Sequence, residues 1–239
     1  MFRREIHRAM QAILDALDPA VLEARGFALG GATRIALAHG EVRESGDLDF
    51  IGSDARGFAD LRAAVRAHGY AALFRDTTTL ELPREPRSDQ YGIRFPVRAG
   101  ERTIRVEFIH EGRITLGRPV REPFCALPCL SIEDCFAEKL LASSDRGGDT
   151  AELDRDIVDL AVLREVHGPI HPAAWASAER AYGGSVRTDL TACIQRFRTD
   201  AARRGRAFRG LRVDDPERVL RGIEALAADL GLGPPTPDE

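Results

Sequence analysis

The hydrophobic pattern changes its period near residue 120, and this change constrains the fold more than any other feature of the sequence. Before it, segments of helical periodicity alternate with short segments typical of strands. After it, every periodic segment is helical. A chain of 239 residues, 44% of them hydrophobic, is long enough to bury a core of this kind. We therefore expect an α/β or α+β unit with a mixed sheet, followed by a helical unit.

The same change in pattern predicts the domain boundaries. We expect residues 1–120 to form the mixed unit and residues 121–230 to form the helical unit. Residues 111–130 contain three prolines and little periodicity, which predicts an irregular connector. Residues 231–239 (GLGPPTPDE) are rich in glycine and proline and are expected to form a flexible tail.

The periodicity also predicts the individual elements. We expect helices over residues 3–24, 32–39, 57–68, 131–143, 153–163, 172–182, 187–203 and 216–229. We expect strands over residues 27–29, 47–51, 91–97 and 103–109, with a hairpin turn at residues 99–100.

Composition argues against several classes of protein. No segment approaches the roughly 18 uncharged apolar residues that a membrane helix needs. The N-terminal residues MFRREIHRAM are charged and no apolar run follows them, so we expect neither a signal peptide nor a membrane span. Four cysteines without a CxxC pair predict a reduced, cytoplasmic setting and no zinc site. They are Cys125, Cys129, Cys135 and Cys193.

Acidic and apolar residues alternate in the segment 47–50 (DLDF). Residues i and i+2 of a strand point to the same side, so Asp47 and Asp49 are expected on one face. Two carboxylates this close repel each other unless water or a cation lies between them. Their oxygens suit Mg²⁺, which usually binds one or two carboxylates together with substrate phosphates and water. The alternative is a solvated strand edge.

A third carboxylate could come from the segment 105–108 (RVEF). Val106 and Phe108 alternate with polar residues, so Glu107 is expected on the wet face of its strand. A single glutamate on a strand is usually only solvated. Next to the segment 47–51, Glu107 becomes a candidate for the third carboxylate of a metal site.

A pair of glycines ends the first predicted strand. Gly30 and Gly31 precede a helix, and glycine lets a backbone approach a ligand closely. The N-terminus of the following helix offers unpaired N–H groups and a partial positive charge, which suit a phosphate. A plain tight turn is the alternative.

One residue, Lys139, stands out in a chain that otherwise uses arginine. Of the 34 basic residues, 33 are arginine. A compact ammonium is a point-charge partner for a phosphate, whereas a guanidinium prefers bidentate geometry. We therefore expect Lys139 to contact phosphate, so that Lys139→Ala would abolish activity at little cost in stability. Asp156 and Asp159 share one helix edge and are expected to form salt bridges or to position Lys139.

Together these residues resemble a known superfamily. A glycine turn before a helix, D-x-D on the next strand and a carboxylate on a later strand form the pattern of the DNA polymerase β-like nucleotidyltransferases. The sequence is most similar to the AbiEii-type abortive-infection toxins, whose patterns GG, R-x-S-x-D-[LI]-D-F, K-L-x-A and R-D-x-x-D-L are matched by residues 30–31, 43–50, 139–142 and 155–160. Two departures are the 15 residues between Gly31 and Asp47, and Glu107 in place of an aspartate.

The resemblance implies a fold, an activity and a set of site residues. It implies a nucleotidyltransferase-fold mixed sheet and a helical unit that completes the active site. It implies transfer of a nucleoside monophosphate from an NTP to an acceptor hydroxyl, with two Mg²⁺ ions held by Asp47, Asp49 and Glu107. The implied nucleotide-binding residues are Gly30, Gly31, Thr33 and Lys139. The implied catalytic residues are Asp47, Asp49, Glu107, Lys139 and Asp156.

In this family the acceptor is thought to be RNA, often the tRNA 3′ end, and an antitoxin protein is the expected partner. An arginine-rich segment, residues 196–212, carries seven arginines and one acid in a protein whose net charge is −4. It is a candidate phosphate-backbone contact through Arg203, Arg204 and Arg206, or simply a solvated helix end. Two alternatives stay open: an acceptor that is a protein or a small molecule such as an aminoglycoside, and a non-catalytic binding module.

Overall fold

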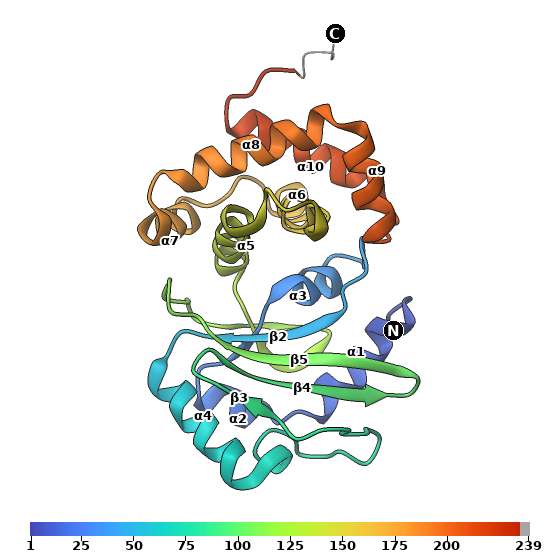
Figure 1. Ribbon diagram of the computed structural model, residues 1–239, viewed down its shortest axis with the longest axis vertical. Coiled ribbons are helices and arrows are strands. Elements are labelled where there is room, and N and C mark those ends of the chain that lie inside the picture. Colours follow the sequence, from blue (N-terminus) through green and yellow to red (C-terminus); the bar gives the residue numbers. More distant parts are fainter. Residues whose placement is uncertain (235–239) are drawn as a thin grey trace. The chain divides into compact units, whose positions relative to one another are not determined.

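The computed structural model describes residues 1–234, and the last five residues of the predicted tail lie outside the described part. The chain forms two compact units (Figure 1). The first unit comprises residues 1–41 and 45–131, and the second comprises residues 42–44 and the chain from residue 132 onward. Residues 121–131, which the sequence pattern assigned to the helical unit, therefore belong to the first unit.

The first unit contains a seven-stranded mixed sheet in the order β3-β4-β5-β2-β1-β7-β6. The strands are β1 (Ala28–Leu29), β2 (Asp47–Gly52), β3 (Arg87–Ser88), β4 (Gly92–Ala99), β5 (Arg102–His110), β6 (Val120–Glu122) and β7 (Cys125–Cys129). β2 pairs in parallel with β5, and β1 pairs in parallel with β7, whereas the other neighbours are antiparallel. The mixed α/β fold predicted from the sequence is confirmed.

The two faces of the central strands differ sharply in burial. Leu48 and Phe50 of β2 and Val106 and Phe108 of β5 are all 0% exposed. They form the core with apolar residues of α1 (Glu5–Ala16) and α4 (Ala55–His68). Because side chains alternate along a strand, the acidic residues of β2 and β5 must lie on the other face.

Two predicted elements of the first unit differ from the structure. The segment 3–24 is two helices, α1 and α2 (Pro19–Ala24), because Pro19 has no N–H to continue a helix and Asp18 caps a new one. The expected irregular connector, residues 111–130, contains the hairpin of β6 and β7. Its prolines hid this strand pairing, because Pro128 interrupts the alternation that predicts strands.

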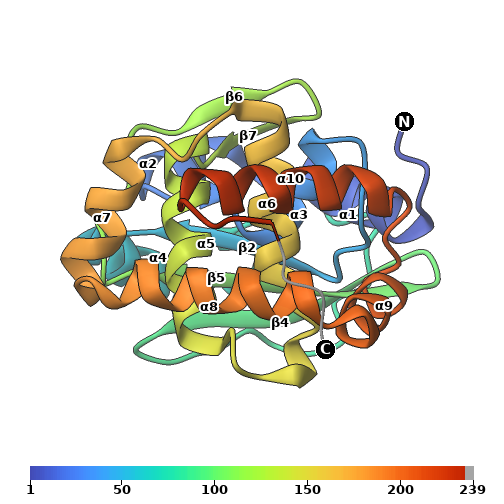
Figure 2. The ribbon, with the colours of Figure 1, turned by 90° about the horizontal axis from the view of Figure 1, so that it is seen from above.

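The second unit is helical. Its helices are α5 (Ile132–Arg146), α6 (Arg155–His167), α7 (Pro172–Tyr182), α8 (Ser185–Thr199), α9 (Ala201–Gly210) and α10 (Pro216–Asp229). The predicted helix 187–203 is divided into α8 and α9 at Asp200, whose side chain accepts a hydrogen bond from the N–H of Arg203. Figure 2 shows α8 and α10 side by side across α5 and α6.

Helix α6 is the centre of this unit. Every residue from Asp156 to Leu163 is buried. Helix α10 approaches it so closely that a Cβ at Gly222 would lie 2.1 Å from the carbonyl oxygen of Ala161. Residues 42–44 join the unit through backbone hydrogen bonds of Glu44 to Leu211 and of Asp214 to Val42. No helix within residues 1–234 is long and apolar enough to cross a membrane.

Candidate active site

The strand register places two of the predicted carboxylates side by side. Asp49 on β2 is the cross-strand partner of Glu107 on β5, and Asp47 is the partner of Arg105. Because residues i and i+2 of a strand share a face, Asp47, Asp49 and Glu107 all lie on the face opposite the core. This shared face follows from one parallel pairing of strands that are about 60 residues apart in the sequence.

Arginine side chains lie among these carboxylates. The guanidinium of Arg105 is 3.0 Å from Asp47 Oδ2 and 3.6 Å from Glu107 Oε2, and Arg94 Nε is 2.9 Å from Glu107 Oε1. Burial alone would lower the pKa of Arg105, but the charges of Asp47 and Glu107 outweigh it and raise that pKa. Sequence reasoning missed both arginines as site residues. Both alternate with apolar neighbours, as residues on an exposed strand face do, but no spacing rule shows which acids they contact.

The donor set suits a divalent cation by its chemistry. Oxygen ligands from adjacent strands match what Mg²⁺ prefers, and Arg94 and Arg105 show that this face holds positive charge. Within residues 1–234, however, no three His, Cys, Asp or Glu side chains lie together as a metal-ligand group. The convergence of Asp47, Asp49 and Glu107 on metal ions therefore stays a prediction.

The glycine pair lies directly against Asp49. Gly31 begins α3 (Gly31–Ala38) with φ +61°, and a Cβ there would be 2.4 Å from Asp49 Oδ2. A Cβ at Gly30 would be 2.8 Å from the side chains of Ile51 and Leu130. Both positions thus exclude larger residues for steric reasons. The N-terminus of α3 and the Asp49 carboxylate are consequently neighbours.

Thr33 has a structural contact that the sequence did not predict. Its side chain is 1% exposed, and its hydroxyl lies 2.5 Å from the carbonyl oxygen of Asp47 and 2.7 Å from the hydroxyl of Ser45. These hydrogen bonds attach the start of α3 to the start of β2. Thr33 therefore supports the geometry of the acidic strand.

A buried histidine holds the loop before β2. Nδ1 of His7 is 2.9 Å from Glu41 Oε1, and its Nε2 accepts a hydrogen bond from the N–H of Ser45. Because a backbone N–H can only donate, Nε2 carries no proton and Nδ1–H donates to Glu41. The sequence signal for this contact was weak, since His7 lies on the apolar side of a helix 34 residues before its partner.

Lys139 lies in a buried charge network within the second unit. Its ammonium is 2.8 Å from Asp156 Oδ1 and 2.6 Å from Asp159 Oδ2, and its side chain is 7% exposed. Arg146 forms an ion pair with Asp156, and Arg43 forms a bidentate pair with Asp159. Three cations thus share two carboxylates.

The network shifts the ionisation of its members. Burial alone would raise the pKa values of Asp156 and Asp159, but the neighbouring cations outweigh it and hold both pKa values below their usual range. Burial alone would lower the pKa of Lys139, but the two carboxylates raise it. All three groups therefore remain charged at neutral pH. The expectation that Lys139 could be removed at little cost in stability does not fit this packing.

The three predicted RNA-binding arginines differ in their surroundings. Arg203 is 9% exposed, and Nε and Nη2 of its guanidinium each lie 2.6 Å from a carboxylate oxygen of Asp154. A buried bidentate ion pair leaves Arg203 little surface for RNA, so the predicted RNA contact does not fit its surroundings. Arg204 donates to the carbonyl oxygens of Phe197 and Arg198 near the end of α8. Arg206 is exposed.

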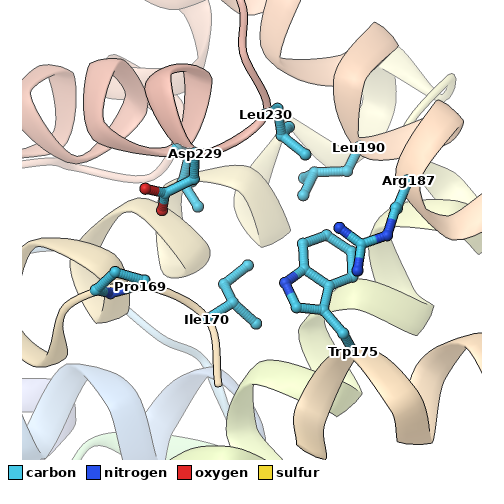
Figure 3. Close-up of a pocket in the computed structure, with 8 residues that line it drawn as sticks. Pro169, Ile170, Trp175, Arg187, Leu190, Asp229 and Leu230 are labelled. Carbon is cyan, nitrogen blue, oxygen red and sulfur yellow. The ribbon is translucent and has the colours of Figure 1, made fainter. Parts of the chain in front are cut away.

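A cavity of about 230 Å³ lies elsewhere in the second unit (Figure 3). Trp175 and Arg187 line it, with the guanidinium carbon of Arg187 4.0 Å from the Trp175 ring centroid. Asp229 also lines it and pairs with Arg164. None of the predicted site residues lines this cavity.

Comparisons with known proteins place the chain in a family. The family model described as "Nucleotidyl transferase AbiEii toxin, Type IV TA system" matches residues 12–227. JHP933 from Helicobacter pylori is a similar solved structure, with a TM-score of 0.48, 15% identity, and coverage of 95% of this chain and 92% of that chain. An antigenic nucleotidyltransferase-like protein from Paracoccidioides brasiliensis is similar at a TM-score of 0.46 and 14% identity, covering 80% and 94%. A search of curated proteins found no match.

The family match extends over most of the chain and establishes the class of protein as a nucleotidyltransferase. The chain belongs to the AbiEii nucleotidyltransferase toxin family of type IV toxin–antitoxin systems. Membership implies a nucleoside triphosphate substrate and an antitoxin partner, and enzymes of this class generally use a divalent metal. The resemblance found from the sequence motifs is confirmed.

The contact between Gly31 and Asp49 predicts the effect of adding one methyl group. Gly31→Ala should lose about 1–2 kcal/mol of stability because φ is positive. It should also lower transferase activity on the order of 100-fold because Asp49 is displaced. Gly100→Ala is the matched control, with φ +60° and nothing within 4 Å of the added Cβ. Urea unfolding should show a loss of stability for Gly31→Ala at least as large as that for Gly100→Ala, because only Gly31→Ala adds a steric clash. Equal activities of the two variants would contradict the role of this contact.

Removal of Lys139 should destabilise the second unit. Lys139→Ala leaves two buried carboxylates with one cation fewer, which should cost about 3–5 kcal/mol. Arg155→Ala is the control, since its side chain is 38% exposed and its ion pair with Glu152 should contribute at most about 1 kcal/mol. The single tryptophan, Trp175, lies in this unit, so its fluorescence in urea measures the loss. Equal midpoints for the two variants would show that the buried carboxylates do not need Lys139 to compensate their charge.

The stability of this unit should fall in acid. Asp156 and Asp159 have lowered pKa values in the folded protein. Their contribution to stability is therefore complete above the pKa of the unfolded chain, about 3.9, and is lost as the pH falls toward the pKa values of the folded state. The raised pKa of Lys139 gives a contribution that is lost only as the pH rises above about 10.4. Urea unfolding followed by Trp175 fluorescence from pH 7 to pH 3 should show a steep loss below about pH 4. Asp159→Asn should show a shallower loss, and an equal slope would exclude Asp159 from the effect.

Proposed function

We propose that this protein transfers a nucleoside monophosphate from an NTP to a hydroxyl of RNA, at the tRNA 3′ end, and releases pyrophosphate. The proposal is supported chiefly by one observation: Asp49 lies beside Glu107 in register and beside Gly31 at the start of a helix. Carboxylates next to a helix N-terminus combine metal ligands with a phosphate-binding backbone. In its cell the protein acts as the toxin of a toxin–antitoxin pair.

Asp47, Asp49 and Glu107 are proposed to hold two Mg²⁺ ions. When bound, the metal ions supply Lewis-acid stabilisation of phosphate charge and activation of the attacking oxygen. Arg105 and Arg94 exchange their ion pairs with these carboxylates for contacts to phosphate oxygens. Both side chains are more than a third exposed, so they can turn away without unpacking the core.

The nucleotide is proposed to bind at the start of α3. Gly30 and Gly31 let the triphosphate approach the backbone, and Thr33 keeps that turn attached to β2. Lys139 is proposed as a further phosphate contact, as the family resemblance implies. An ammonium has three N–H donors, and Asp156 and Asp159 accept two of them, so a phosphate oxygen would require only the third. Asp156 then acts as a positioning residue for Lys139.

The RNA contact is proposed to involve the exposed part of the arginine-rich segment. Arg206 and Arg209 on α9 are exposed, whereas Arg203 is not. Exposed guanidinium groups in a protein of net charge −4 are suited to a phosphate backbone.

Replacement of the carboxylates tests the proposed chemistry. Asp47→Asn, Asp49→Asn and Glu107→Gln should each reduce transfer by at least about 100-fold, because a lost ligand forfeits several kcal/mol of charge stabilisation. Glu101→Gln, an exposed acid between β4 and β5, should retain full activity. The assay is incubation with total tRNA, Mg²⁺ and each α-³²P-NTP in turn.

The same assay separates the alternative acceptors. Label in tRNA supports the proposal. Label in a protein lysate or an aminoglycoside, with none in tRNA, would replace the proposed acceptor. The absence of label with every NTP and acceptor would favour a module that only binds nucleotide or a partner.

Replacement of exposed arginines tests the RNA contact. The double variant Arg206→Ala, Arg209→Ala should raise the KM for tRNA and leave the KM for NTP unchanged. The plot of the logarithm of the tRNA binding constant against the logarithm of salt concentration should also change. Its slope should be shallower by about 0.7–0.9 for each phosphate contact that is lost. The control is Arg56→Ala, Arg66→Ala, which removes two exposed charges from α4. If both double variants bind tRNA as the unmodified protein does across a salt series, α9 does not contact the RNA.

A further inference from the structure

Two cysteine thiols meet on strand β7, outside the residues that form the candidate active site. Sγ of Cys125 lies 3.8 Å from Sγ of Cys129, which is contact distance for two sulfur atoms. The two cysteines are free and four residues apart. In a regular strand, residues four apart are separated by about 13 Å. The strand must therefore be strongly bent between them.

A β-bulge causes this bend. Arg121 of β6 pairs with Pro128, but its neighbour Glu122 pairs with Cys125, so β7 has two extra residues between these partners. Extra residues on one strand bend it and increase its twist. Both sulfur atoms consequently lie near the carbonyl oxygen of Leu127, at 3.8 and 3.7 Å.

The two thiols have unequal environments. Cys125 is half-buried, whereas Cys129 is 0% exposed. A hydrogen bond from the Cys129 thiol lowers the pKa of Cys125, and the same contact, together with burial, raises the pKa of Cys129. The more accessible thiol, Cys125, thus ionises more readily than Cys129. This is the usual arrangement of an attacking thiol and a resolving thiol.

We propose that Cys125 and Cys129 form a redox-active dithiol that is modified by a low-molecular-weight disulfide such as oxidised glutathione. The Cys125 thiolate attacks one sulfur of that disulfide, which forms a mixed disulfide and releases one thiolate. Cys129 then loses its proton and attacks Sγ of Cys125, which breaks the mixed bond and releases the second thiol. The net reaction converts two protein thiols and one small disulfide into a protein disulfide and two small thiols.

The site lies on a strand that supports the glycine turn. Cys129 pairs with Leu29 of β1, the residue before Gly30. The 1%-exposed Arg34 of α3 donates to the carbonyl oxygen of Leu130, next to Cys129, and pairs with Glu122 of β6 at 2.5 Å. Oxidation would therefore occur between the two anchors that hold α3 to this hairpin.

The test is oxidation of the full chain under native conditions. The protein is incubated with oxidised glutathione, its remaining thiols are blocked with N-ethylmaleimide, and the fragments are sequenced by mass spectrometry. A single tryptic peptide, residues 122–139, holds Cys125, Cys129 and Cys135, so a second cleavage after Glu133 is needed to separate Cys135. The expected result is a fragment 122–133 that is two hydrogen atoms lighter and carries no maleimide.

Four single variants assign the steps. Cys129→Ser should stop at a stable glutathione adduct on Cys125, and Cys125→Ser should form neither adduct nor disulfide in this fragment. Cys135→Ser and Cys193→Ser remove the two other buried cysteines and should oxidise as the unmodified protein does. Full maleimide labelling of Cys125 and Cys129 after oxidation, or a disulfide that includes Cys135, would overturn the proposal. Because the unmodified protein is itself the primary sample, a variant that fails to fold does not decide the outcome.

Discussion

The parallel pairing of β2 with β5 is the interaction on which the rest of the first unit depends. It brings Phe50 next to Phe108, with ring centroids 4.9 Å apart, on one face, and Asp49 next to Glu107 on the other. The apolar face supplies the free energy of burial, at about 25 cal/mol per Å² of apolar surface. Like charges on the opposite face repel each other. Arg94 and Arg105 offset part of this repulsion, and the packing of the core holds the two strands together. The chemistry of this site is thus supported by the stability of the sheet beneath it.

The second unit uses buried charge in a different way. Arg43, Lys139, Arg146, Asp156 and Asp159 form a closed network around the central helix α6. Removing charges from water costs several kcal/mol for each ion, and good geometry only balances that cost. Apolar residues would stabilise this position at least as well. The buried charges are therefore better explained by the orientation that they impose on each other than by a net gain in the free energy of unfolding. Each of the two carboxylates is fixed in place by two cations.

Glycine contributes to both units by letting atoms approach closely. Gly31 leaves room for the carboxylate of Asp49, and Gly222 leaves room for the backbone of α6. Neither role involves mobility, since the space that a Cβ would fill is occupied by another part of the chain. Bends in strands and breaks in helices are also produced by a few neighbouring residues. The bulge of β7 and the cap at Asp200 each redirect the chain within one or two residues.

Local sequence pattern was enough to predict most of the elements and the side chains that share a face. Hydrophobic period depends on residues within about ten positions, so it correctly predicted β2, β5 and the faces that carry Asp47, Asp49 and Glu107. The family could also be identified from the sequence, because each of its motifs is a short run of neighbouring residues. Which charges meet depends instead on tertiary packing. Arg43 and Asp159 are 116 residues apart, Arg203 and Asp154 are 49 apart, and Lys139 and Asp156 are 17 apart. Nothing in the local sequence distinguishes the buried Arg203 from the exposed Arg206, because both belong to the same arginine-rich helix. Burial of a charge depends on what packs against it from elsewhere in the chain, and that contact is a property of the fold rather than of the segment.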